Sequence, residues 1–273
     1  QGNFRVTVRA AKYDDGLLLD PGSNSRLEAS DGAITVKIPT ERQNAEPQSV
    51  EIERAGVYQA DVYLTTLNDV KPDDSRLQDA LVGAWRFDGT ATSEGEKELV
   101  GELTEGAEFV ESPFKQALRF NGMGGAVVVP RDESMNIGEG EFTVAAWIHP
   151  RGLRQAGIVA AGGYGYAHGW LVDMPNGNGV LRIETSNSDN QLNGAVQSSP
   201  GAIANDRWSH VAVVVRRGEN NTRLYVNGFE VGKGTINGAN LDNPNVGLHI
   251  GRIPQADEFK GEIDEVHLYR RAL

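Results

Sequence analysis

The sequence predicts an all-β protein built from two consecutive β-sandwiches. Short apolar runs alternate with polar positions along the chain, and strand signals recur about every 10–15 residues. Many of the 33 glycines lie between these runs, where they favour turns. Apolar residues make up 39% of the chain and charged residues 23%, as in ordinary globular domains.

Residues 1–78 are predicted to form the first, small β-sandwich, of unknown role. Alternating apolar positions indicate strands around 4–8, 34–38 and 58–64. Asp-Gly and Asp-Pro-Gly turn signals lie between them. The polar segment from Asn68 to Asp79, which contains Pro72, is interpreted as a linker.

Residues 79–273 are predicted to form a larger sandwich or jelly roll. Its strand-like segments are 118–120, 126–129, 142–148, 158–160, 171–173, 181–185, 210–215, 223–226, 248–251 and 263–269. Asn227-Gly228 separates two apolar runs and predicts a hairpin with a type I′ turn. Trp85, Trp147 and Trp208 each lie in a strand-like apolar run, which favours core packing.

Charge and motif content exclude several classes of function. The net charge of −12 and a pI of about 4.9 argue against a nucleic-acid partner. No run approaches the roughly 18 apolar residues of a membrane span, so no membrane insertion is expected. The absence of cysteine excludes disulfides and thiolate metal sites. No HExxH zinc motif, GxSxG elbow or glycine-rich phosphate loop occurs.

From Leu81 onwards, an ordered series of segments resembles the laminin-G-like, concanavalin A-like jelly rolls of bacterial exported proteins. The segments are Leu81–Gly89, Ala117–Gly122, Val127–Pro130, Phe142–Pro150, Arg207–Val214, Leu224–Gly228, His249–Gly251 and Gly261–Val266. The resemblance implies two stacked antiparallel sheets. It also implies an extracellular, periplasmic or cell-surface location. It names no single ligand, because such folds host many functions.

The segment Gly261-Glu262-Ile263-Asp264 resembles the start of the active-site motif of laminarinase-like β-glucanases. Retaining glycosidases need a second carboxylate about 5 Å from the first. On a regular strand the same-face position four residues after Glu262 is Val266, and His267 follows it. The acid/base is therefore missing, and no catalytic residue is predicted. A glycoside hydrolase or lyase, with acids paired from separate strands, is the alternative.

Asp264 also lies between apolar residues of the closing strand, where a carboxylate must be solvated, hydrogen-bonded or metal-bound. In the jelly rolls that the chain resembles, the equivalent aspartate helps to hold a structural calcium ion near the opening strand. The resemblance thus implies Ca²⁺ ligands from Asp264, Asp88 and the backbone at Gly122. A simple hydrogen-bonded aspartate is the alternative.

A glycine-rich loop supplies the predicted ligand-binding residues, which are Tyr164, Tyr166, His168 and Trp170. Aromatic rings present apolar faces to the C–H side of sugars, although local packing of the loop is the alternative. The sequence therefore favours a non-catalytic, lectin-like module that binds a glycan or an extracellular protein, as part of a longer polypeptide. A structural spacer is the remaining alternative.

Overall fold

The computed structural model describes residues 4–11, 26–30, 33–37, 57–64, 80–113, 115–163 and 168–273. The chain separates into two compact units, Gln1–Pro72 and Asp73–Leu273. The described residues form strands and one short 3-10 turn, η1 (Glu133–Met135), so the all-β prediction is confirmed. Within these residues, no helix is both long and apolar enough to cross a membrane.

Two antiparallel pairs of strands make up the described part of the first unit. Strand β1 (Phe4–Ala11) pairs with β4 (Val57–Leu64), and β2 (Arg26–Ser30) pairs with β3 (Ala33–Lys37). The three strands expected from apolar alternation correspond to β1, β3 and β4. Alternation with a period of two therefore located them correctly.

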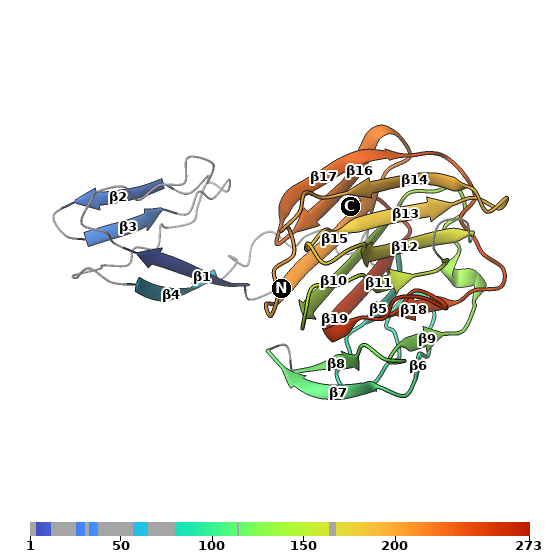
Figure 1. The fold of residues 1–273 in the computed structure, drawn as a ribbon, viewed down its shortest axis with the longest axis horizontal. Helices are drawn as coiled ribbons and strands as arrows, with labels where there is room; N and C mark the ends of the chain where they lie inside the picture. The colour runs from blue at the N-terminus through green and yellow to red at the C-terminus, as the bar shows by residue number, and fades with distance from the viewer. Residues whose placement is uncertain are drawn as a thin grey trace. The chain divides into compact units, whose positions relative to one another are not determined.

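An eight-stranded antiparallel sheet forms one layer of the second unit (Figure 1), in the order β17-β16-β15-β10-β19-β8-β7, with β5 also paired to β19. Its strands are β5 (Leu81–Trp85), β7 (Ala107–Ser112), β8 (Lys115–Asn121), β10 (Phe142–Pro150), β15 (Ser209–Val215), β16 (Gly218–Val226), β17 (Phe229–Ile236) and β19 (Lys260–Tyr269). The closing strand β19 thus contacts three partners, β10, β5 and β8.

A seven-stranded antiparallel sheet forms the other layer, in the order β14-β13-β12-β11-β18-β9-β6. Its strands are β6 (Glu102–Leu103), β9 (Val127–Val129), β11 (Ala156–Ala160), β12 (Gly169–Met174), β13 (Arg182–Ser186), β14 (Leu192–Gln197) and β18 (Leu248–Ile250). Buried side chains from both sheets form one core cluster, so the layers pack face to face as a sandwich.

The Asn227-Gly228 turn joins β16 to β17 as predicted. Val226 pairs with Phe229, and both central residues have positive φ, 52° at Asn227 and 82° at Gly228. A type I′ turn requires this combination, and asparagine and glycine adopt it with the least strain. The hairpin prediction is therefore confirmed.

Of the three tryptophans predicted to pack in the core, one does so. Trp85 is fully buried in the core, as expected. Trp147 and Trp208 are partly exposed and do not belong to the core cluster. In β10, Ala146 and Ile148 face the core, so Trp147 between them must face away from it. Core packing was thus the wrong interpretation for two of the three tryptophans.

Candidate functional site

A β-bulge in β19 creates the candidate site. Trp147 of β10 pairs with Asp264, whereas Ala145, two residues earlier, pairs with His267, three residues later. One extra residue is therefore inserted in β19, and Glu265 in this stretch has φ of 47° in the left-handed region. The insertion changes which side chains point away from the core, onto what is called here the outward face of the eight-stranded sheet.

The bulge corrects the sequence-based assignment of faces on β19. Val266 is fully buried in the core and does not share a face with Glu262. The outward face instead carries Glu262, Asp264 and His267. The extra residue between Asp264 and His267 shifts the alternation by one position, so that Val266 faces the core. Regular alternation was the wrong assumption here, since a bulge is not visible in a count of residues.

Asp264 is completely buried although it faces away from the core. Its Oδ1 accepts a hydrogen bond from the backbone N–H of Glu265 at 2.9 Å, and its Oδ2 lies 3.5 Å from the Ser112 hydroxyl. Burial, with a further contribution from the nearby charges of Glu265 and Asp88, raises the pKa of Asp264 to about 7. These two contacts are fewer than a buried carboxylate needs to offset the cost of removing its charge from water.

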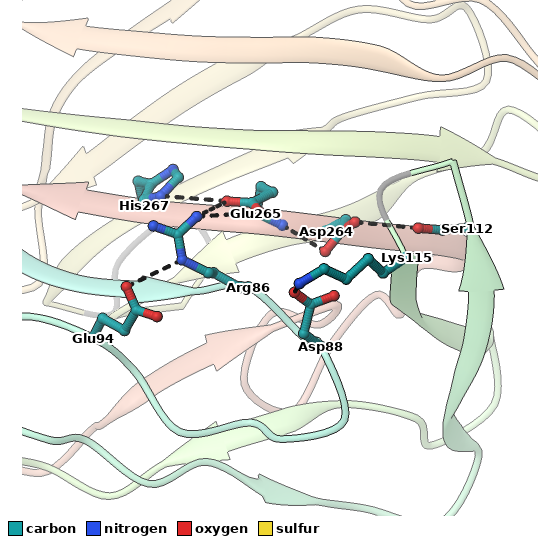
Figure 2. Close-up of polar contacts among 8 residues, drawn as sticks. All are labelled: Arg86, Asp88, Glu94, Ser112, Lys115, Asp264, Glu265 and His267. Atoms are coloured by element: carbon teal, nitrogen blue, oxygen red, sulfur yellow. Dashed lines mark hydrogen bonds and ion pairs between the residues drawn. The ribbon is translucent and has the colours of Figure 1, made fainter. Parts of the chain in front are cut away.

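Asp88 follows the opening strand β5 and lies near Asp264 (Figure 2). Lys115 donates a hydrogen bond from Nζ to Asp88 Oδ2 at 2.6 Å, which lowers the pKa of Asp88. The second oxygen, Oδ1, is buried and has no hydrogen-bond partner in the described part of the chain. The fold therefore brings together the two carboxylates expected for a cation site.

Arg86 links the bulge to the segment that follows β5. Its guanidinium contacts Glu94 at 3.1 Å and Glu265 at 3.2 Å, and Glu265 also lies 3.6 Å from His267. Burial lowers the pKa of His267 to about 4, so this imidazole is neutral at pH 7. A surface pocket beside this network is lined by Ala84, Arg86, Phe87, Asp88, Thr90, Thr92, Glu94, Lys115 and Glu265.

Gly122 is not part of this arrangement. Asn121 pairs with Lys260, which lies about 13 Å from Asp264 along β19 at the usual rise of a strand. The Gly122 carbonyl accepts a hydrogen bond from Arg154 at 2.9 Å. The expected backbone ligand is therefore a wrong assignment, and the Ser112 hydroxyl lies beside Asp264 in its place.

The oxygen donors present match the chemistry of a hard cation such as Ca²⁺. They are two carboxylates, one of them with an unpartnered buried oxygen, and a hydroxyl. Among the described residues, no group of three or more Asp, Glu, His or Cys side chains is placed to hold a metal. Any Ca²⁺ bound here would take its remaining ligands from carbonyl groups and water.

The predicted aromatic loop contributes less than expected. Tyr164 and Tyr166 lie outside the described residues. Trp170 is only 3% exposed and packs on Phe142 with ring centroids 5.3 Å apart, so its assignment as a ligand residue is wrong. The His168 ring is hydrogen-bonded through Nε2 to the Asn240 carbonyl at 3.0 Å, which ties it to a neighbouring loop.

A cluster of partly exposed rings lies instead on the outward face, and sequence reasoning missed it. Trp147 and His210 are cross-strand partners with ring centroids 5.3 Å apart. His149 and Trp208 stack at 5.3 Å with an interplanar angle of 19°. These four residues are called the ring cluster below. Trp147 also pairs with Asp264, so the ring cluster adjoins the carboxylates.

Glu262 anchors one end of the ring cluster. It is 3% exposed and accepts hydrogen bonds from Arg119 at 2.9 Å, Arg151 at 2.8 Å and His149 at 2.7 Å. Burial alone would raise the pKa of Glu262, but these hydrogen bonds hold it below its usual value. Glu262 thus fixes the imidazole on which Trp208 stacks.

Several solved structures share this fold, and the titles of some of them name toxin binding domains. The binding domain of Paraclostridial Mosquitocidal Protein 1 matches 72% of this chain and 50% of its own, with 19% identity and a TM-score of 0.59. Domain 4 of AbnA, a GH43 extracellular arabinanase from Geobacillus stearothermophilus, matches 71% of this chain and 94% of its own, with 20% identity and a TM-score of 0.55.

The binding domain of Botulinum neurotoxin DC matches 72% of this chain at 15% identity, with a TM-score of 0.55. This chain spans about half the length of the two toxin domains. No curated protein matches the sequence. The sequence profile described as the concanavalin A-like lectin/glucanases superfamily matches residues 121–273, which is more than half of the chain. The chain belongs to the concanavalin A-like lectin/glucanases superfamily.

Proposed function

We propose that this chain is a non-catalytic glycan-binding module of an exported protein, and that it acts outside the cytoplasm. The observation that carries the proposal is the ring cluster on the outward face. Trp147 and His210 border the small side chains of Ala145 and Ala212, which pair with one another across β10 and β15. Flat rings beside small residues suit the apolar face of a sugar, and adjacent charged groups suit its hydroxyls.

Two related folds support a sugar as the ligand. Domain 4 of AbnA was solved in complex with arabinotriose, and the binding domain of Botulinum neurotoxin DC in complex with SialylT. The same neurotoxin domain was also solved in complex with rat synaptotagmin II. An extracellular protein is therefore the second candidate partner for this module.

The buried state of the two carboxylates favours binding over hydrolysis. Glu262 is 3% exposed and held by two arginines and a histidine, and Asp264 is 0% exposed. A polysaccharide cannot reach either group, as a retaining mechanism would require. We expect no release of reducing sugar from laminarin or lichenan. Turnover that survives repurification and is lost in Glu262→Gln would contradict this.

Binding is tested on a glycan array, with affinities of positive glycans measured by calorimetry. Trp147→Ala is expected to weaken binding about 30-fold, since a buried aromatic anchor contributes roughly 2 kcal/mol. Phe229→Ala is the matched control, because Phe229 is 72% exposed at the tip of the β16–β17 hairpin. Unchanged affinity in Trp147→Ala, with the fold intact by circular dichroism, would overturn the proposal.

We also propose that the module binds a structural Ca²⁺ ion through Asp88 and Asp264. The unpartnered Oδ1 of Asp88 and the uncompensated carboxylate of Asp264 support this assignment. The ion would neutralise both carboxylates and connect the opening strand to the bulge of the closing strand. Because Trp147 pairs with Asp264, this would also fix one side of the ring cluster.

A further inference from the structure

The β7–β8 hairpin holds both carboxylates of the proposed calcium site. Ser112, the last residue of β7, pairs with Lys115, the first residue of β8. The Ser112 hydroxyl approaches Asp264, and the Lys115 ammonium approaches Asp88 (Figure 2). A single hairpin end therefore covers two acidic groups that come from opposite ends of the domain sequence.

Lys115 reaches Asp88 from an unusual backbone conformation. Its φ of 96° lies in a region that residues other than glycine rarely adopt. Its side chain is 78% exposed, yet its ammonium lies 2.6 Å from Asp88 Oδ2. The contact therefore depends on charge attraction and not on burial, and it can open without disturbing the core.

Arg86, the other cation near Asp88, is held more tightly than Lys115. Arg86 is held by ion pairs to Glu94 and Glu265, and its guanidinium contributes less to the pKa shift of Asp88 than Lys115 does. The ammonium of Lys115 is thus the positive group that directly occupies an oxygen of Asp88. A divalent ion that binds Asp88 with both oxygens has to displace it.

We infer that Lys115 is a tethered counter-ion that competes with Ca²⁺ for Asp88. This inference rests on the proposed calcium site. When calcium is scarce, the ammonium neutralises Asp88. When calcium is abundant, the ion takes the place of the ammonium, and the exposed lysine side chain moves into solvent. Lys115 therefore sets the calcium concentration at which the site fills.

The test compares Ca²⁺ affinity, measured by calorimetry on metal-free protein of residues 1–273, between the natural sequence and Lys115→Met. Methionine keeps the unbranched stem of the side chain and removes the charge. Lys115→Met has no exposed ion pair to break before the ion reaches Asp88, so we expect binding roughly fivefold tighter in the variant. Lys233→Met, which removes another exposed lysine of the same sheet, is expected to leave the affinity unchanged.

Each outcome separates the two proposals. Equal affinity in the natural chain and in Lys115→Met would overturn the competition while leaving the calcium site standing. Binding in neither protein would overturn the calcium site, and the role of Lys115 with it. Lys115→Gly, which suits the positive φ, is the second variant if the methionine variant folds poorly, and its affinity should rise equally. Asp88→Asn combined with Lys115→Met should abolish the gain.

Discussion

The side chain of Asp264 has a defined position, but few hydrogen bonds offset the cost of burying its charge. It is completely buried, yet it receives one backbone hydrogen bond of 2.9 Å and one long contact from a hydroxyl group. A buried carboxylate in this state favours its protonated form unless a cation is near. The residue thus gains more from a bound ion than an exposed aspartate would.

Calcium is therefore expected to raise the melting temperature of the metal-free protein. At 100 times the dissociation constant, binding to the folded state alone adds about 2.7 kcal/mol to the free energy of unfolding. The gain should disappear in Asp264→Asn, which removes the ionisable group while keeping its shape. Identical melting curves in calcium and in excess chelator would contradict the expectation.

His249 predicts a separate loss of stability in acid. Burial, together with the charge of Arg252, lowers the pKa of His249 to about 4, below its ordinary value of 6.5. The unfolded chain therefore binds the proton more readily than the folded chain does. The stabilising contribution is complete above pH 6.5 and falls as pH decreases towards 4. Urea unfolding at pH 7.5 and pH 5 should show a smaller difference in His249→Gln; an equal difference would argue against this.

At the level of elements, the turns that join strands make different demands on glycine. Gly228 has φ of 82°, and nothing lies within 4 Å of the position that a Cβ atom would take there. Gly251 has φ of 80°, but the Phe120 ring lies only 2.6 Å from the corresponding position. Phe120 is itself packed edge-on against Phe259, with centroids 6.4 Å apart. Position 228 therefore requires a residue that adopts a positive φ, whereas position 251 requires in addition a residue without a Cβ atom.

Replacing these glycines by alanine separates the two effects. Gly228→Ala should lower the free energy of unfolding by about 1 kcal/mol, from backbone strain alone. Gly251→Ala adds overpacking against the core and should lower it by about 2–4 kcal/mol. Chemical denaturation of both variants measures the difference. Equal losses would show that the core near Phe120 adjusts freely to a methyl group.

On the scale of the whole molecule, the second unit contains both sheets and the core cluster between them. We therefore expect residues 73–273 to fold without the first unit. Their near-ultraviolet circular dichroism should show the tertiary packing of a folded sandwich, and their thermal unfolding should be cooperative. Aggregation or non-cooperative unfolding of this fragment would mean that the first unit is needed.

The sequence predicted the strands well, because apolar alternation and turn residues are local signals. Through the family resemblance it also indicated the two carboxylates of the site, but not the side chains around them, because these come from distant segments. Lys115 and Ser112 lie far in sequence from the carboxylates they contact, and no local pattern marks them. Apolar runs placed Trp147 in a strand but did not decide which face it occupies.

The bulge in β19 also determines how this strand tolerates changes in length. Successive side chains of a regular strand point to opposite faces, and the extra residue near Glu265 shifts this alternation by one position. Deleting Glu265 would return the strand to regular alternation and leave Val266 and Leu268 facing the core, where they already lie. Deleting a residue from a regular strand would instead turn every later side chain to the opposite face. The closing strand can therefore lose this one residue and still direct the same apolar side chains into the core.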